Sequence, residues 1–423
     1  MTCWAADAIG VGLVRHGGGA TGVAATGQAP PGGGGRQWRL FRRLNKPGVI
    51  GLDIGSTFVR AIQFADVGGT PTVHAAAQCP IAGGAAEGAG PQAGLLAAIR
   101  EVLSSASFHG NQVVTALGAS SVQLKNLRLP RMPAEEMKDA VLFEALARFE
   151  AEPSDVQIQY LHVGEVRHGN EQKEEVVAFA ANSESVAARL DLLESLKLSP
   201  VAIDITPCAV ARSFVRFLRR TEDENSVNVF IEIGFTATTI ILTRGAHISF
   251  VKVVDIGGQQ FNEAVSRALD VSAEEAADLR VRLMDSGRRG AEEDSGVPPE
   301  IASTIGDALR PLIERLCREV QLCLRYFAVT FRGGRPESLT VVGGEAAEPR
   351  VVELLRELID VPCTIGHPLR GMAGMDRMGG RERRVFQPAW AVAGGLALRG
   401  TRWVGGAATG RSSLRRALSL QGA

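Results

Sequence analysis

The sequence contains no long hydrophobic run. Within its 423 residues no apolar stretch approaches the ~20 residues that a membrane-spanning helix requires, and its start lacks the basic residues and leucine-rich core of a secretory signal. We therefore expect a soluble protein with no transmembrane segment. At ~100 to 200 residues per domain, a chain of this length is expected to divide into several units.

The sequence also lacks an excess of charge and paired cysteines. Its 46 basic and 46 acidic residues cancel, so the whole chain has no attraction to nucleic acid. Neither the six cysteines nor the seven histidines have the spacing of a metal site, and no disulfide framework is indicated. Reduced thiols in a cytoplasmic protein are the expectation.

Large side chains are nearly absent from residues 1–35, which consist mostly of Gly and Ala. Such a segment buries too little area to offset its ordering entropy, so we expect 1–47 to be a disordered extension. Its basic part, 36–46, has the sequence RQWRLFRRLNK and is either a short helix on an anionic membrane surface or a solvated linker. The tail 404–423 is expected to be flexible.

The most informative pattern is a repeat. Residues 51–65, GLDIGSTFVRAIQFA, are echoed by 229–242, VFIEIGFTATTIIL, with an acid, a glycine and a threonine in the same register. Each copy predicts two strands joined by a turn that offers backbone N–H groups and hydroxyls to phosphates, with a carboxylate for a metal ion. One copy alone would be read as an ordinary tight hairpin. The residues concerned are Asp53, Gly55, Ser56 and Thr57 in the first copy, and Glu232, Gly234, Thr236, Thr238 and Thr239 in the second.

Two further elements fit a nucleotide site. In 339–355, LTVVGGEAAEPRVVELL, Gly343 and Gly344 would let adenine and ribose lie against the backbone, although a tight loop is the plainer interpretation. Asp204 ends a predicted strand before a helix, where it would orient the attacking water or the metal, or else cap the helix.

Periodicity predicts strands and helices along the rest of the chain. Met137, Val141, Ala145 and Phe149 repeat every four residues and form one apolar helical face, flanked by Leu142 and Leu146. Other expected helices cover 93–105, 183–196, 261–269, 301–328 and 349–358, and 285–300 is expected to be an exposed loop. Expected strands are 49–54, 58–65, 72–78, 112–117, 122–129, 156–163, 175–180, 201–205, 247–254 and 338–342.

These elements, in this order, resemble the actin-like ATPase superfamily. Within it the chain resembles the PilM family of type IV pilus assembly proteins, which is related to FtsA. The resemblance is carried by 124–160, LKNLRLPRMPAEEMKDAVLFEALARFEAEPSDVQIQY, by 253–280, VVDIGGQQFNEAVSRALDVSAEEAADLR, and by GLALR at 395–399. The small-residue segment 386–400, FQPAWAVAGGLALRG, then corresponds to the last connecting segment and suits close packing across the hinge.

The resemblance implies an α/β protein with the actin-like ATPase fold. Two ribonuclease-H-like α/β domains would enclose a nucleotide cleft, with a small α+β subdomain of the FtsA and PilM type inserted in the first. The implied first half comprises 48–110, 198–225 and 383–403, with the inserted subdomain at 111–197. The second half comprises 226–256 and 330–382, with a helical subdomain at 257–329.

The resemblance also implies ligands and partners. The ligands are ATP and Mg²⁺, with phosphate contacts at the two turns, Asp53 and Glu232 on the metal side, Gly343, Gly344 and Glu345 on the adenosine side, and Arg280 near the ribose. The partners are the cytoplasmic N-terminal peptide of a PilN-like membrane protein, bound in a groove beside the inserted subdomain, and the pilus motor ATPase complex. Self-association is a further expectation, and the partner would hold the protein peripherally at the inner membrane.

Two departures from the superfamily pattern affect the expected chemistry. Glu232 stands where an Asp is usual, and Phe235 stands where a small residue is common. The extra methylene would displace a metal-bound water, so we expect ATP binding with weak or absent hydrolysis. Alternatives are a type II secretion homologue, an FtsA-like filament or membrane-tethering protein, and a small-molecule kinase with Asp204 as its base.

Overall fold

The fold is described from a computed structural model, which covers residues 47–81, 91–168, 171–289, 296–331, 334–379, 387–399 and 401. The expectations for 1–46, including the basic segment, and for the tail 404–423 lie outside the described residues.

The first half is built on a five-stranded sheet of order β3-β2-β1-β4-β8. β1, β2 and β3 form an antiparallel meander, whereas β4 and β8 run parallel to β1. The central strands are short apolar runs because both faces of the sheet are covered. The strands are β1 (Pro47–Ile54), β2 (Phe58–Val67), β3 (Thr70–Pro80), β4 (Gln112–Leu117) and β8 (Ser199–Ile205).

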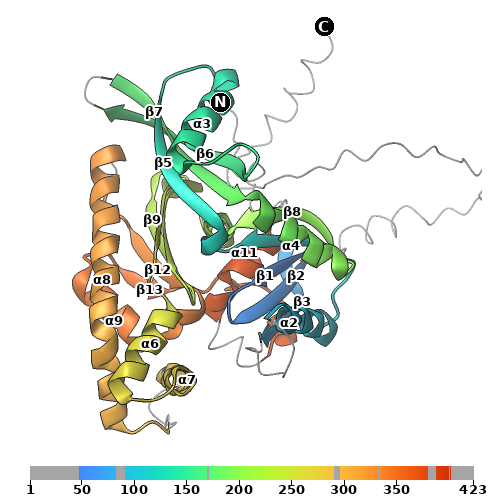
Figure 1. The fold of residues 1–423 in the computed structure, drawn as a ribbon, viewed down its shortest axis with the longest axis vertical. Helices are drawn as coiled ribbons and strands as arrows, with labels where there is room; N and C mark the ends of the chain where they lie inside the picture. Colours follow the sequence, from blue (N-terminus) through green and yellow to red (C-terminus); the bar gives the residue numbers. More distant parts are fainter. Residues whose placement is uncertain are drawn as a thin grey trace, which may run out of the picture.

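The second half repeats this topology. Its sheet has the order β11-β10-β9-β12-β13, again an antiparallel meander followed by two parallel strands. The repeat seen in the sequence is therefore the first hairpin of each sheet, β1-β2 and β9-β10. The predicted actin-like fold with two ribonuclease-H-like halves is confirmed (Figure 1). The strands are β9 (Val227–Ile233), β10 (Thr238–Arg244), β11 (His247–Val254), β12 (Ser338–Val342) and β13 (Cys363–Ile365).

The inserted subdomain is a three-stranded sheet of order β5-β7-β6 with one helix on it. It comprises β5 (Val122–Pro130), α3 (Ala134–Phe149), β6 (Val156–His168) and β7 (Glu171–Asn182). Met137, Val141, Ala145 and Phe149 are buried against the sheet, as the four-residue repeat predicted, whereas Leu142 is 42% exposed. Figure 1 places the subdomain at one end of the molecule, beside the top of α8.

Helices cover the faces of the two large sheets. The first half has α2 (Pro91–Ser105), α4 (Ser183–Ser195), α5 (Thr206–Val215) and α11 (Ala391–Ala397). The second half has α6 (Gly258–Leu269), α7 (Ala273–Arg289), α8 (Pro299–Phe331) and α9 (Pro349–Leu358). α8 runs the length of the second half, and its buried line follows the predicted one from Ile305 to Phe327 (Figure 1).

Three sequence-based boundaries differ from the structure. β4 and α4 were assigned to the inserted subdomain, but β4 pairs between β1 and β8, and Leu192 and Leu193 of α4 pack in the core of the first half. The end of the second half, which contains Leu369, Met372 and Met378, packs on the first sheet. The predicted loop from 285 begins too early because α7 continues to Arg289.

A shared core joins the two halves. One cluster contains Val114 and Ala209 from the first half together with Phe230 and Ile241 from the second. α11 packs close to β1 and α5, where a Cβ on Gly51 would lie 2.2 Å from the carbonyl oxygen of Ala393. The small residues of 386–400 thus serve the close packing that the sequence predicted, although 386 and 400 lie outside the described residues.

Candidate functional site

The two hairpins have the same turn geometry. The N–H of Gly55 donates to the carbonyl of Phe58 at 3.0 Å, and the N–H of Gly234 donates to the carbonyl of Ala237 at 3.0 Å. Asp53 and Glu232 each occupy the next-to-last position of the first strand. The turns therefore superimpose residue by residue, and Phe235 takes the place of Ser56.

Each turn leaves two backbone donors without a protein acceptor. The structure gives the N–H groups of Ser56 and Thr57 no acceptor among the described residues, and the same holds for Phe235 and Thr236. Ser56, Thr57 and Thr236 are exposed. Free N–H groups at a glycine turn are the donors that bind phosphate oxygens. By contrast, the hydroxyl of Thr238 is buried and donates to the carbonyl of Ile256 at 2.6 Å, so it is not free for a ligand.

Asp53 and Glu232, one from each half, interact electrostatically. Burial, together with the negative charge of Asp53, raises the pKa of Glu232 to about 8, against the opposing effects of Arg60 and of a hydrogen bond from Thr239. Burial also raises the pKa of Asp53, although Arg60 and Arg189 oppose this shift. At both carboxyls burial therefore outweighs the positive charge of the nearby arginines.

Arg60 and Arg189 interact electrostatically with Asp53 and were not identified from the sequence. Arg60 lies opposite Asp53 in the β1-β2 register, and its Nε donates to Oε1 of Gln78 at 3.1 Å. Its two Nη atoms have no acceptor among the described residues. Arg189 of α4 is held by the hydroxyl of Thr115 at 3.2 Å and by a backbone carbonyl. The alternation of β2 places residue 60 on the face of Asp53, a signal that could have found Arg60.

The start of α6 supports the second turn. The N–H of Gly258 donates to the carbonyl of Gly234 at 3.1 Å, and the N–H of Gln259 donates to that of Phe235 at 2.7 Å. A Cβ on Gly257 would lie 2.6 Å from both carbonyl oxygens, so only glycine permits this approach. The start of the motif at 253–280 thus fixes the turn between β9 and β10.

The predicted adenosine loop lies against the same hairpin. Gly343 has φ +101°, and a Cβ there would lie 2.3 Å from the carbonyl oxygen of Ile233. Gly344, the first residue of a 3₁₀ helix (Gly344–Ala347), is exposed, and a Cβ there would meet nothing within 4 Å. The structure therefore brings Gly343 next to the second turn and leaves open space at Gly344.

Arg280 is less available than the sequence suggested. Its side chain is 2% exposed and pairs with Glu345 at 2.6 Å and with Glu348 at 3.0 Å. It also donates to Oδ1 of Asn262 at 2.6 Å. Because its donors are engaged, Arg280 positions Glu345 at the cleft instead of offering a free cation to a ribose.

Asp204 does not face the cleft as a base would. Its carboxylate is fully buried and pairs with Arg212 at 2.9 Å and with Arg399 at 3.0 Å. It also accepts the N–H of Ile205 at 2.8 Å. The structure gives Asp204 a structural role that the sequence did not predict, because its ion pairs tie β8, α5 and the chain after α11 together.

The two turns offer more groups to phosphates than to a metal ion alone. The four free N–H groups suit phosphates, whereas the described residues contain no group of three or more His, Cys, Asp or Glu able to hold a metal. Mg²⁺ usually needs only one or two carboxylates when phosphates and water complete its shell. Asp53 and Glu232 match that requirement, and a cation between them would offset the raised pKa values.

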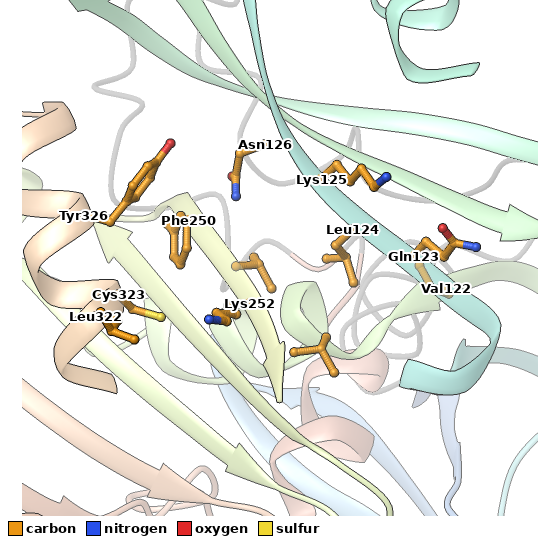
Figure 2. A pocket seen from close by; sticks show the side chains of 12 residues that line it. Val122, Gln123, Leu124, Lys125, Asn126, Phe250, Lys252, Leu322, Cys323 and Tyr326 are labelled. Atoms are coloured by element: carbon orange, nitrogen blue, oxygen red, sulfur yellow. The ribbon is translucent and has the colours of Figure 1, made fainter. Parts of the chain in front are cut away.

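A second feature is a groove beside the inserted subdomain. A cavity of about 780 Å³ lies between β5, β11 and α8. Figure 2 shows Leu124 and Asn126 extending from β5 toward the strand that carries Phe250, with Leu322 and Tyr326 of α8 at the side. The resemblance implies a partner peptide in a groove beside the inserted subdomain, and this groove lies beside β5 of that subdomain. No helix among the described residues is long and apolar enough to cross a membrane.

Comparison with known proteins agrees with this geometry. The family model for the type IV pilus assembly protein PilM matches residues 51–401. A chain of the solved PilM-PilN type IV pilus biogenesis complex is 27% identical with a TM-score of 0.68, and the match covers 84% of this chain and 99% of that one.

The cell division protein FtsA of Bacillus subtilis (strain 168) is 24% identical over 159 residues, which cover 35% of this chain. The match spans 36% of FtsA, about a third of that curated relative's length. The family match, in contrast, extends from β1 to a few residues beyond α11. The chain belongs to the PilM family of type IV pilus assembly proteins, within the actin-like ATPase fold.

Proposed function

We propose that this protein is an ATP-binding adaptor of type IV pilus assembly. It captures the cytoplasmic N-terminal peptide of a PilN-like inner-membrane protein and links that protein to the pilus motor ATPase complex. The observation that carries the proposal is the groove between β5, β11 and α8, in a chain that resembles a component of the PilM-PilN complex over 84% of its length. Association with the inner membrane then comes through the partner.

The cleft supplies the nucleotide part of the proposal. The free N–H groups of the two turns and the Nη atoms of Arg60 hold the phosphates of ATP, and Gly344 leaves room for the adenosine. Mg²⁺ would bind Asp53 and Glu232 together with phosphate oxygens and would neutralise the two carboxylates. Bound ATP would thereby join the two halves of the molecule.

Hydrolysis is expected to be slow or absent. Asp204, the only base named from the sequence, is occupied by Arg212 and Arg399. Glu232 has a pKa of about 8 and is therefore largely protonated at neutral pH without a cation. The kinase alternative loses its candidate base in the same way. A turnover of purified protein near ~1 per second or faster would contradict this proposal.

Titration of ATP in the presence of Mg²⁺ tests the cleft. We expect Asp53→Ala to bind ATP at least ~10-fold more weakly than the unmodified protein, a loss of about 1.4 kcal/mol. Asp360→Ala, which removes a carboxylate that is 96% exposed, serves as the control. Equal affinities of Asp53→Ala and the unmodified protein for ATP would contradict the proposed role of Asp53 in binding Mg²⁺.

Binding of the partner peptide tests the groove. Leu322 lines the groove and Val329 does not, although both are exposed apolar residues of α8, at 47% and 82%. We expect Leu322→Arg to weaken binding of a fluorescent PilN-like N-terminal peptide at least ~10-fold, and Val329→Arg to leave it unchanged. Failure of the folded, unmodified protein to bind the peptide would refute the proposed partner.

A further inference from the structure

A second cavity lies between the two halves, apart from the hairpin turns and from the groove beside the inserted subdomain. Its volume is about 220 Å³, and it is lined by α5 with the chain that follows it and by β9, β10, β12 and β13. Asn228 and Ser338 line it at the amino ends of β9 and β12, whereas the turn between β9 and β10 follows the carboxyl end of β9. At ~3.4 Å per residue, the strand from Asn228 to Gly234 separates the cavity from that turn by roughly 20 Å.

Aromatic rings line one side of this cavity. Phe214 of α5 pairs with Phe217 and with Phe230 of β9, at ring-centroid distances of 6.0 Å and 5.0 Å. Both pairs are tilted, at 45° and 32°. Tilted and offset rings attract one another beyond the area they bury, so a flat ring in the cavity would extend the row. The other apolar lining residues are Ala211, Val215, Leu218 and Ile365.

Threonine hydroxyls line the side formed by the second sheet. Thr243, Thr340 and Thr364 face the cavity, and within the described part of the chain their hydroxyls have no hydrogen-bond partner. Thr243 is only 2% exposed. By contrast, the hydroxyl of Ser338 donates to Oδ1 of Asn228 at 2.8 Å. A buried hydroxyl without a partner is costly, so these threonines suit a ligand that carries a polar substituent.

Arginines without an acidic partner stand at one end of the cavity. Arg216 donates from Nη2 to the carbonyls of Pro368 at 2.8 Å and of Arg370 at 2.6 Å, while its buried Nε has no acceptor among the described residues. The guanidinium carbons of Arg216 and Arg370 lie 4.1 Å and 5.3 Å from the centroid of the Phe217 ring. No described carboxylate forms an ion pair with Arg216, Arg219 or Arg370.

The electrostatics of these arginines favour an anion. Burial, together with the positive charges of Arg219 and Arg370, lowers the pKa of Arg216 to about 10. A carboxylate beside the three guanidiniums would offset their mutual repulsion and accept charge-assisted hydrogen bonds. The cavity therefore combines an aromatic wall, free hydroxyls and a cationic end.

We propose that this cavity binds a small aromatic acid, with its ring beside Phe214 and Phe217 and its carboxylate at Arg216 and Arg370. Pockets for drug-sized ligands usually measure ~300 to 1,000 Å³, so this smaller cavity suits a single ring. α5 belongs to the first half and the strands belong to the second, so the ligand would bridge the two halves. The inference is independent of the nucleotide and of the partner peptide.

Three small probes test the proposal with the full chain. Phenylacetate carries a ring and a charge, phenylacetamide carries the same ring without the charge, and acetate carries the charge without the ring. We expect phenylacetate to bind with a Kd near ~1 mM, at least ~10-fold more tightly than either of the others, in titrations followed by ligand-observed NMR. Equal binding of phenylacetamide or of acetate would overturn the proposal, as would a Kd of phenylacetate above ~10 mM.

Substitutions show whether the probe binds in this cavity. Arg370→Gln removes a charge but keeps the backbone carbonyl that Arg216 contacts, so it should reduce the affinity for phenylacetate to that for phenylacetamide. Arg315→Gln makes the same change on an exposed residue of α8 and should leave binding unchanged.

A cavity-filling substitution gives a second readout. Thr364→Phe places a ring in the cavity from the edge strand β13 and should abolish binding of phenylacetate. A thermal unfolding scan first establishes that each variant is folded, and Arg370→Gln alone decides if Thr364→Phe does not fold. Unchanged binding of phenylacetate by a folded Arg370→Gln or Thr364→Phe variant would place the ligand elsewhere and overturn the proposal.

Discussion

At the scale of residues, the hairpins β1-β2 and β9-β10 are unequal copies. Asp53 lies opposite Arg60, whereas the equivalent Glu232 lies opposite Thr239. Both arginines whose charge opposes the raised pKa of Asp53 belong to the first half. Within the described part of the chain Glu232 accepts a hydrogen bond from the hydroxyl of Thr239, and its pKa rises to about 8 because of burial and of Asp53. A bound cation would therefore stabilise the charged form of Glu232 in the second copy more than that of Asp53 in the first.

The raised pKa of Glu232 predicts a pH-dependent stability. An unfolded Glu titrates near ~4.3, so between that pH and about 8 the native state binds more protons than the unfolded state. Stability must then fall as pH rises through this range, and Glu232→Gln should remove the fall. We expect the difference in Tm between variant and parent to increase from pH 5 to pH 8.5 in metal-free buffer. A pH-independent difference would contradict the argument, and Glu357→Gln, an exposed site on α9, is the control.

Asp204 provides a second prediction at this scale. Removing its charge leaves Arg212 and Arg399 buried or nearly buried without a counter-ion, at 5% and 14% exposure. Breaking a buried pair in this way costs about 3–5 kcal/mol. We expect Asp204→Asn to lose that much stability in urea unfolding, whereas Asp360→Asn, which breaks a surface pair, should lose little. An Asp204→Asn variant as stable as its parent would show that the ion pairs of Asp204 with Arg212 and Arg399 do not stabilise the packing of β8, α5 and the chain after α11.

At the scale of elements, α11 is a short helix whose small residues allow two close contacts. It packs against β1 through Ala393 and Ala397, and against α5 through Gly395. A Cβ on Gly395 would lie 1.8 Å from the carbonyl oxygen of Ala209, whereas a Cβ on Gly394 would meet its first neighbour at an ordinary 3.4 Å. Two adjacent glycines therefore have different roles on one helix.

This contrast predicts opposite effects of the same substitution. Gly394→Ala should be neutral or stabilising by up to ~1 kcal/mol, since alanine favours helix. Gly395→Ala should destabilise by at least ~2 kcal/mol, because α11 must move away from α5. Chemical denaturation of both variants measures the effects. Equal stabilities would show that α11 can shift without cost.

At the scale of the whole molecule, most of the described cysteines lie in the hydrophobic cores. Four of them are buried, Cys208 in the core shared by the halves and Cys317, Cys323 and Cys363 in the core of the second half. Burial raises the pKa of Cys317 to about 12 and those of Cys323 and Cys363 to about 11. Cys79 is partly exposed. Thiol chemistry can therefore measure opening of the folded chain.

We predict that one described thiol reacts rapidly in the native protein. With Cys3→Ser as background, Cys79 should react first with a disulfide reagent at pH 8. The four buried thiols should react only at the rate of unfolding, because they are inaccessible and hold few thiolates. Mass spectrometry locates the modified residues, and denatured protein provides the full count. Rapid modification of Cys208 would indicate that the junction between the halves opens in the native state.

The sequence by itself determined the local elements and the family. Alternating and four-residue patterns predicted most strands and helices, and the repeated acid-x-Gly turn predicted the doubled fold, because such signals depend on neighbours in the chain. The sequence predicted subdomain boundaries less well where a strand's subdomain depends on pairing with residues distant in the chain. β4 was assigned to the inserted subdomain, but in the structure it pairs with β1 and β8 of the first sheet.

Only the tertiary structure decided which polar groups remain free. Asp204 and Arg280 looked available in the sequence, yet Arg399 and Glu348, distant in the chain, neutralise them. The alternation of β2 could have placed Arg60 on the face of Asp53, but only the fold shows which acceptors its guanidinium meets. Availability for a ligand depends on burial and on long-range pairing, and the sequence alone contains neither.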